Sequence, residues 1–263
     1  MFQNDKKTIP IPIEIIDEIL GYLHSDELSL QSCALVSKSW APSCRKYIFG
    51  RLNFDNPLDF AIWSRSVSTA PNGPHHYTRE LTITNHYLEK ERYRSPEYPT
   101  VFLQHFRLFC NVQDLTIECS GSQQTIDNIS MSHVFGHLFG ILRSLSIHGA
   151  VCSPQALISF VASFQQLERL YLHGIWFEAS DIPHPLPEKH TFKGEFFLAD
   201  WDDSSEEFIG ILARYDLQYR EVSVNGECWL QDTTWNRCLT KFSNHLEKFG
   251  IHWSESDGES ARW

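Results

Sequence analysis

The chain has 263 residues, enough for one large domain or for a small module followed by a larger one. Hydrophobic residues make up 42% of it and charged residues 21%, with 13 Gly and 12 Pro, which excludes wholesale disorder and low-complexity architecture. Lys and Arg total 22 against 33 Asp and Glu, a formal charge of −11. Because such a surface repels phosphates, we expect neither nucleic acid nor a membrane as a partner.

The cysteines and the N-terminus indicate the compartment. The 7 cysteines are odd in number, form no CxxC pair and lie mostly within apolar runs. No apolar segment followed by a small-residue cleavage site stands near the N-terminus, and no apolar run approaches the roughly 18 residues of a membrane span. We therefore expect free thiols in a reducing compartment, which is the cytoplasm or the nucleus.

The first fifty residues predict three short helices. Pro12 can open the first helix, because its missing N–H costs nothing at that position. Apolar side chains then recur at helical spacing, at Ile15, Ile16, Ile19, Leu20 and Leu23. Further apolar groups follow at residues 28–36 and 40–49. A unit of about forty residues buries its apolar faces poorly, so we expect it to need a partner.

The same residues resemble the F-box family. The shared features are an Ile-Pro-x-Glu-Ile opening at residues 11–15, the Ile19-Leu20 pair, and Leu35-Val36-Ser37-Lys38-x-Trp40. Ile11 stands where Leu is commoner, and the doubled Ile-Pro of residues 9–12 leaves two possible registers, of which Glu14 and Ile15 favour Pro12.

The resemblance covers residues 9–50 and implies docking onto a Skp-family adaptor, and through it onto a cullin. The implied contact residues are Ile11, Pro12, Ile15, Ile19, Leu20, Leu35, Val36 and Trp40. Trp40 is also expected to fill the space between the helices, which makes Pro12, Leu35 and Val36 the better surface candidates. The alternative is a three-helix cap on the domain that follows.

Short segments of alternating apolar residues recur through the rest of the chain, 25–34 residues apart. They predict strands at residues 52–54, 81–83, 115–117, 145–147, 170–172, 196–198, 222–224 and 249–251. Two of these segments end in the same dipeptide, His148-Gly149 and His173-Gly174. Helical spacing between them predicts helices at residues 58–67, 101–110, 133–142, 154–165, 206–215 and 235–246.

This alternation resembles the degenerate leucine-rich repeats that follow F-boxes. It implies that residues 51–253 form an α/β solenoid with a curved parallel sheet, followed by a flexible acidic tail at residues 254–263. The three prolines of residues 182–187 forbid a helix in that repeat. Residues 72–76 and 89–99 are expected to be insertions. The alternative is an ordinary α/β domain of similar spacing.

No motif of an enzyme is present in the sequence, so we expect no catalytic residue, metal or cofactor. His133 and His137 are four residues apart but lack the Glu of a metallohydrolase motif. An acidic run could hold a hard cation but lacks the spacing of a calcium loop, and helix capping explains it more simply. It consists of Asp200, Asp202, Asp203, Glu206 and Glu207.

Strand alternation places the polar residues of each strand on the concave face, opposite the apolar pairs. Arg169, Tyr171, His173 and Phe197 are expected together near its middle, with Glu195 and Glu221 on adjoining strands. Exposed aromatics and Arg are typical of binding hot spots, so we expect these four to bind a target protein. A solvated sheet face without a partner is the alternative.

These features together resemble a substrate-recognition subunit of an SCF-type (cullin-RING) ubiquitin ligase, with no covalent chemistry of its own. Such a subunit docks on the adaptor through its F-box and holds the target on its repeats. The alternative is a repeat scaffold that binds partners without assembling a ligase. A hydrolase hidden in an α/β domain is the third reading, which the absence of nucleophile and metal motifs disfavours.

Overall fold

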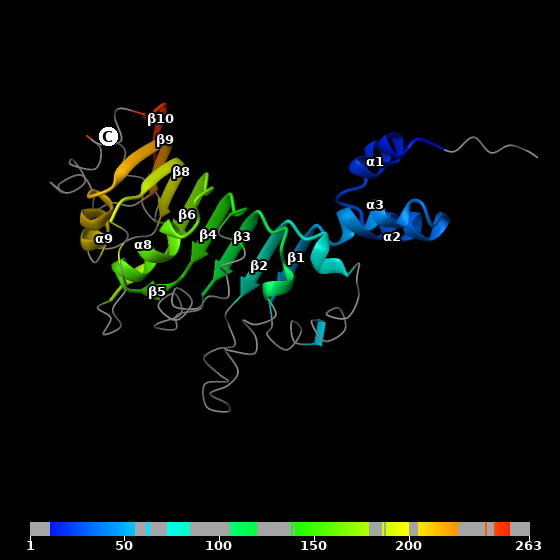
Figure 1. Cartoon of the computed structure of the whole chain (residues 1–263), viewed down its shortest axis with the longest axis horizontal. Helices are drawn as coiled ribbons and strands as arrows, with labels where there is room; N and C mark the ends of the chain where they lie inside the picture. Colours follow the sequence, from blue (N-terminus) through cyan, green and yellow to red (C-terminus); the bar gives the residue numbers. More distant parts are fainter. Residues whose placement is uncertain are drawn as a thin grey trace, which may run out of the picture.

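The chain forms a helical unit that leads into a parallel sheet (Figure 1). The computed structural model describes residues 11–55, 62–63, 73–84, 106–119, 138, 140–178, 186, 188–199, 205–225, 240 and 245–252. The helical unit lies at one end of the sheet and strand β10 at the other (Figure 1). Within the described residues no helix is long and apolar enough to cross a membrane.

The helical unit consists of α1 (Ile13–Tyr22), α2 (Glu27–Val36) and α3 (Ala41–Ile48). Helix α1 begins directly after Pro12. Helix α2 is capped by Asp26, whose carboxylate accepts the backbone N–H of Ser29 at 3.1 Å. The three helices enclose a small core made of Ile16, Leu20, Leu30 and Cys44, with Trp40 and Tyr47 packed against it. The three predicted helices are confirmed, and this core holds them together.

Two residues alone, Phe49 and Gly50, separate α3 from strand β1 (Arg51–Phe54). The carbonyl oxygen of Gly50 accepts the backbone N–H groups of both Arg79 and Glu80, at 2.8 and 3.0 Å. A Cβ at Gly50 would lie 2.6 Å from the carbonyl oxygen of Lys46, so only glycine fits this junction. The helical unit is therefore joined to the sheet by a short, hydrogen-bonded connection.

All eight predicted strands are confirmed in one parallel sheet, and their order in the sheet follows the chain. After β1 come β2 (Glu80–Thr84), β3 (Asp114–Glu118), β4 (Ser144–His148), β6 (Arg169–His173), β8 (Thr191–Ala199), β9 (Asp216–Asn225) and β10 (Lys248–His252). The apolar residues stand in register: Leu81 pairs with Leu115, Leu115 with Leu145, and Leu145 with Leu170.

One face of the sheet is apolar and packs against helices α8 (Pro154–Ala162) and α9 (Ser205–Leu212). Ser153 caps α8 by accepting the N–H of Ala156 at 3.1 Å, as its position before Pro154 leads one to expect. Rings of Phe177 and Phe208 stack at 5.0 Å inside the shared core. With the helices on this face, the opposite face of the sheet carries the polar residues.

Both helices were predicted, but each ends about one turn earlier than expected: α8 at Ala162 and α9 at Leu212. A helix was also predicted at residues 101–110. The described part of this range, residues 106–110, contains only the 3-10 turn η2 (Phe106–Leu108), so the prediction is wrong there. The three other predicted helices fall mostly outside the described residues. So do the proline-rich segment, the insertion at residues 89–99 and the tail at residues 254–263.

Three features were not predicted from the sequence. Strands β5 (Val151–Cys152) and β7 (Trp176–Phe177) pair as a second, two-stranded sheet. Strands β8 and β9 extend further toward their N-termini than expected, and a bulge at Gly194 interrupts their register. Gly194 has φ +94°, and a Cβ there would collide with the carbonyl oxygen of Glu168. This glycine therefore allows two backbones to approach closely.

Candidate protein-interaction surfaces

Helix α1 exposes large apolar side chains on one of its faces. Ile15, Ile19 and Tyr22 follow one another at helical spacing and are 46%, 42% and 80% exposed, and Ile11 and Pro12 stand exposed before the helix begins. Folding alone would not favour leaving such residues in water. This face can bind an apolar surface of a partner.

Leu20 differs from the expectation. Its side chain is fully buried in the core of the helical unit, beside Ile16. The five apolar residues of the predicted stripe therefore divide into two sets. Ile16 and Leu20, with Leu23 packed against them, hold the helices together, while Ile15 and Ile19 face outward. Leu20 supports this face from within and is not part of its surface.

The end of α2 is the most exposed apolar segment of the helical unit. Leu35 is 89% exposed and Val36 72%, and Leu28 lies two turns earlier on the same side of the helix, 76% exposed. Trp40, which follows this segment, is half-buried and packs against the small core. Leu35 and Val36 thus contribute little to the fold and are free to contact another molecule.

A cleft of about 490 Å³ lies where the helical unit meets the first strands. Asp17, Lys46, His76, Arg79 and Asn111 are among the residues that line it. Lys46 Nζ lies 3.6 Å from Asp17 Oδ2, whereas Oδ1 of the same carboxylate is buried and accepts no hydrogen bond from the described residues. The cleft separates the two parts beside the Gly50 junction.

The polar face of the sheet is ordered into rows, because equivalent positions of neighbouring strands pair directly. One row of residues paired in register, which we call the charged row, consists of Arg51, Glu80, Asp114, Ser144, Arg169, Glu195, Glu221 and Lys248. Two positions further lies the central row: Asn53, Thr82, Thr116, Ser146, Tyr171, Phe197, Ser223 and Gly250.

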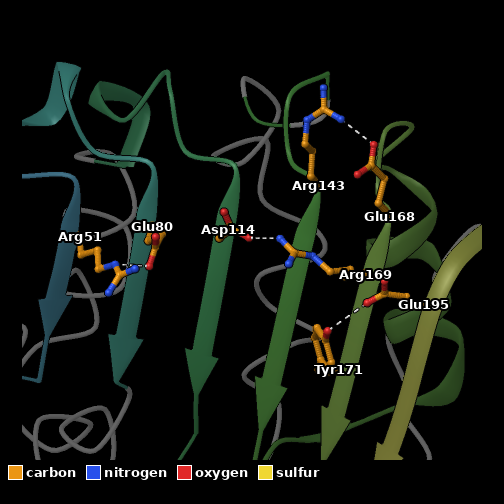
Figure 2. Close-up of polar contacts among 8 residues, drawn as sticks. All are labelled: Arg51, Glu80, Asp114, Arg143, Glu168, Arg169, Tyr171 and Glu195. Atoms are coloured by element: carbon orange, nitrogen blue, oxygen red, sulfur yellow. Dashed lines mark hydrogen bonds and ion pairs between the residues drawn. The ribbon is translucent and has the colours of Figure 1, made fainter. Parts of the chain in front are cut away.

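Ion pairs follow the charged row (Figure 2). Arg51 Nε lies 2.7 Å from Glu80 Oε2 on the next strand. At the other end of the row, Lys248 Nζ lies 3.1 Å from Glu221 Oε2. Arg169 does not pair with its neighbour Glu195; its Nη2 reaches over β4 to Asp114 Oδ1, at 2.7 Å. The position of the predicted target-binding Arg169 is therefore fixed by an ion pair within the chain.

Tyr171 and Phe197 are neighbours in the central row, with ring centroids 6.1 Å apart and planes inclined by 48°. Both side chains are half-buried. The Tyr171 hydroxyl donates a hydrogen bond to Glu195 Oε2 at 3.3 Å (Figure 2). Burial, and next the negative charge of Glu195, raise the pKa of Tyr171, so its hydroxyl keeps its proton at neutral pH.

Two positions beyond the central row, at the C-terminal ends of β2, β3, β4 and β6, lies what we call the far row: Thr84, Glu118, His148 and His173. The rings of His148 and His173 have centroids 5.5 Å apart, and the hydroxyl of Thr84 donates to Glu118 Oε2 at 3.0 Å. Burial and the neighbouring His173 lower the pKa of His148, while Glu118 opposes this shift. His148 is therefore held as a neutral imidazole at pH 7.

Of the four predicted target-binding residues, the structure brings Tyr171 and Phe197 into direct contact. Arg169 is engaged with Asp114, and His173 faces His148 in the far row. The sequence interpretation missed both of these partners. The matching His-Gly ends of two strands were a signal for the histidine pair, whereas nothing in the sequence indicated that Arg169 would reach past β4.

Within the described residues, no group of three His, Cys, Asp or Glu side chains is arranged to hold a metal ion. His133, His137 and most of the acidic run from residue 200 lie outside those residues. Among the described cysteines, Cys33, Cys44 and Cys110 carry free thiols. Comparisons of the chain with protein-family models and with curated proteins find no match.

Proposed function

We propose that this chain is a substrate-recognition subunit of an SCF-type (cullin-RING) ubiquitin ligase. Residues 9–50 act as an F-box that docks on a Skp-family adaptor, and the polar face of the sheet holds the target protein. The observation that carries this proposal is the exposure of apolar side chains at the motif positions. Ile15, Leu35 and Val36 lie in water at 46%, 89% and 72% exposure although each stands where the F-box pattern has an apolar residue.

The sheet supports the second half of the proposal. Eight parallel strands follow one another in chain order, with apolar residues in register on one face, as successive leucine-rich repeats would require. The face opposite α8 and α9 carries half-exposed aromatic and charged residues. Such a face suits a protein target because aromatic residues and Arg dominate the energetics of interfaces.

In this proposal the chain performs no covalent chemistry. Other subunits of the ligase supply the ubiquitin transfer, and this chain contributes by holding a target at a fixed place relative to the adaptor. The short junction at Gly50 suits that task, because the docking unit is joined to the target-binding face without a flexible linker. The assembly would work in the cytoplasm or the nucleus.

Co-purification tests the proposal. The full chain is co-expressed with a Skp-family adaptor and its cullin, and the eluted complex is resolved by size-exclusion chromatography. We expect the three proteins to elute together in equal amounts. If the folded chain elutes alone at micromolar concentrations, the ligase proposal is wrong, and a scaffold that binds partners through the sheet alone becomes the better explanation.

A further inference from the structure

The charged row of the sheet contains one uncompensated carboxylate. Every cation of this row is engaged: Arg51 with Glu80, Arg169 with Asp114, and Lys248 with Glu221. The remaining acidic member is Glu195, whose carboxylate has one described hydrogen bond, from the hydroxyl of Tyr171. Although Arg169 pairs with Glu195 in strand register, its guanidinium is directed away from it, toward Asp114 (Figure 2).

Aromatic rings stand beside this carboxylate. Tyr171 and Phe197 occupy adjacent positions of the central row, on β6 and β8. The next residues of this row are short on both sides: Ser146 on β4 and Ser223 on β9. The ring of Tyr171 is therefore not covered on its β4 side by a large side chain of its own row. A cation held over an aromatic ring is attracted by its π electrons, and more strongly when a carboxylate lies within reach.

We propose that Glu195, Tyr171 and Phe197 form a binding site for a lysine or arginine side chain in an extended, basic segment of a partner protein. The carboxylate of Glu195 pairs with the cation, and the two rings pack against its aliphatic stem and its charge. This proposal depends on the proposed function in one respect, namely that the partner is the target of the ligase. The ability to bind a basic side chain depends only on residues of the sheet.

The charge of the sheet favours a basic occupant over an acidic one. Residues 51–263 carry 17 Lys and Arg against 27 Asp and Glu. An acidic segment placed on Tyr171 would meet the carboxylate of Glu195, without a free cation in the charged row to offset the repulsion. A basic segment gains attraction at the same place, both during encounter and in the complex.

A peptide library tests this site without knowledge of the target. Random twelve-residue peptides displayed on phage are selected on the immobilised full-length protein, and the most enriched peptide is synthesised with a fluorescent label. We expect the enriched sequences to carry Lys or Arg beside an apolar residue more often than the starting library does. In fluorescence anisotropy, Glu195→Gln and Tyr171→Ala should each raise the Kd of that peptide about tenfold.

Two variants control this measurement. Glu80→Gln removes a carboxylate from the same row that Arg51 already neutralises, so the Kd should stay within about twofold of wild type. Tyr171→Phe is compared with Tyr171→Ala: it keeps the ring and loses only the hydroxyl contact with Glu195, so its Kd should lie well below that of Tyr171→Ala. Thermal unfolding of each variant shows that it is folded.

Several outcomes would overturn the proposal: no enriched binder, enrichment without basic residues, or equal binding by wild type and Glu195→Gln. Competition by spermidine at lower concentrations than by the peptide would also overturn it, because the site would then hold a small free cation. Co-purification with the adaptor is measured in parallel on Glu195→Gln. If the chain binds the basic peptide but no adaptor, the site is supported and the ligase proposal is wrong. If it binds the adaptor but no basic peptide, the ligase proposal is supported and the site is wrong.

Discussion

Arg169 of β6 and Asp114 of β3 form an ion pair across the strand that lies between them, with 2.7 Å between Nη2 and Oδ1. The residue of β4 that stands between the two in register is Ser144, which is short and only 8% exposed. A long side chain at this position would block the path of the guanidinium. The pair thus depends on a small residue in the intervening strand, and it leaves Glu195 on the other side of Arg169 without a cation.

The first prediction concerns the energy of this pair. Its side chains are 43% and 37% exposed, so solvent screens the attraction, and we expect a coupling of about 0.5–1 kcal/mol between Asp114→Asn and Arg169→Gln. Urea unfolding of wild type, both single variants and the double variant measures it. The Arg51–Glu80 pair, whose arginine is 74% exposed, is the matched reference and should give a smaller coupling. A larger coupling at Arg51 would contradict this ranking.

The second prediction concerns the exposed end of α2. Replacing Leu35 and Val36 with Asp should abolish adaptor binding, because an unpaired carboxylate in an apolar interface costs several kcal/mol. We expect at least a hundredfold loss of affinity in a titration of adaptor against the full chain. Unfolding free energy should change little, since both side chains are exposed in the free protein.

Leu30 provides the matched control for the second prediction. It lies on the same helix but is 1% exposed in the core of the helical unit, so Leu30→Asp should unfold that unit instead of only blocking its surface. Far-UV circular dichroism separates the two cases. Retention of adaptor by a folded Leu35→Asp, Val36→Asp chain would show that this face does not dock.

The strands could be predicted from the sequence because their signal is local and repeated. Each carries two apolar residues two positions apart, and the same spacing returns eight times, so the pattern alone predicts that Leu145 and Leu170 lie on the buried face. Strands β5 and β7 have only two residues each, too few for an alternating pattern. They exist because the turns after β4 and β6 bring their segments together.

The surfaces were predicted less completely than the sheet. Periodicity predicts that Ile15, Ile19 and Leu20 share one apolar stripe of α1. This stripe is wide enough for one side to face the core and the other to face a partner. Which side is buried depends on the packing against the other helices, and it is the side of Leu20. Likewise, alternation placed Arg169 and Glu195 on the same face. Whether Arg169 turns toward Glu195 or toward Asp114 depends on the size of Ser144, which no local pattern expresses.

The third prediction concerns the glycines that follow β4 and β6. Gly149 and Gly174 both lie in the left-handed region, at φ +63° and +60°. A Cβ at Gly149 would also collide with the carbonyl oxygen of Cys119, whereas at Gly174 the nearest atom is 3.7 Å away. Gly174→Ala should therefore cost about 1–2 kcal/mol of unfolding free energy, from backbone strain alone. Gly149→Ala should cost roughly 3 kcal/mol or more, because the backbone must also shift.

Urea unfolding of the two alanine variants at one temperature provides the comparison for the third prediction. Since both glycines follow a histidine at the end of a strand, they differ mainly in what the added methyl group meets. Equal losses at the two positions would show that strain, and not the contact with Cys119, sets the cost.

The fourth prediction concerns pH and the far row. Because burial and His173 lower the pKa of His148, the unfolded chain binds a proton at this residue more readily than the folded chain does. Stability should be constant above the ordinary histidine pKa of about 6.5 and should fall as the pH drops below it toward the lowered value. His148→Asn should make this decline shallower in urea unfolding between about pH 5 and 7.5. Part of the decline remains, because burial also lowers the pKa of His75 and His190.

The two charged neighbours of His148 test the cause of its shift in opposite directions. His173→Asn removes a group that lowers the pKa of His148, so the decline should become shallower. Glu118→Gln removes the carboxylate that raises this pKa, so the folded chain should accept the proton less readily and the decline should become steeper. The pKa of His148 itself is measured by following its ring proton by NMR in each variant. A steeper decline in His173→Asn, or a shallower one in Glu118→Gln, would mean that the far row does not govern this titration.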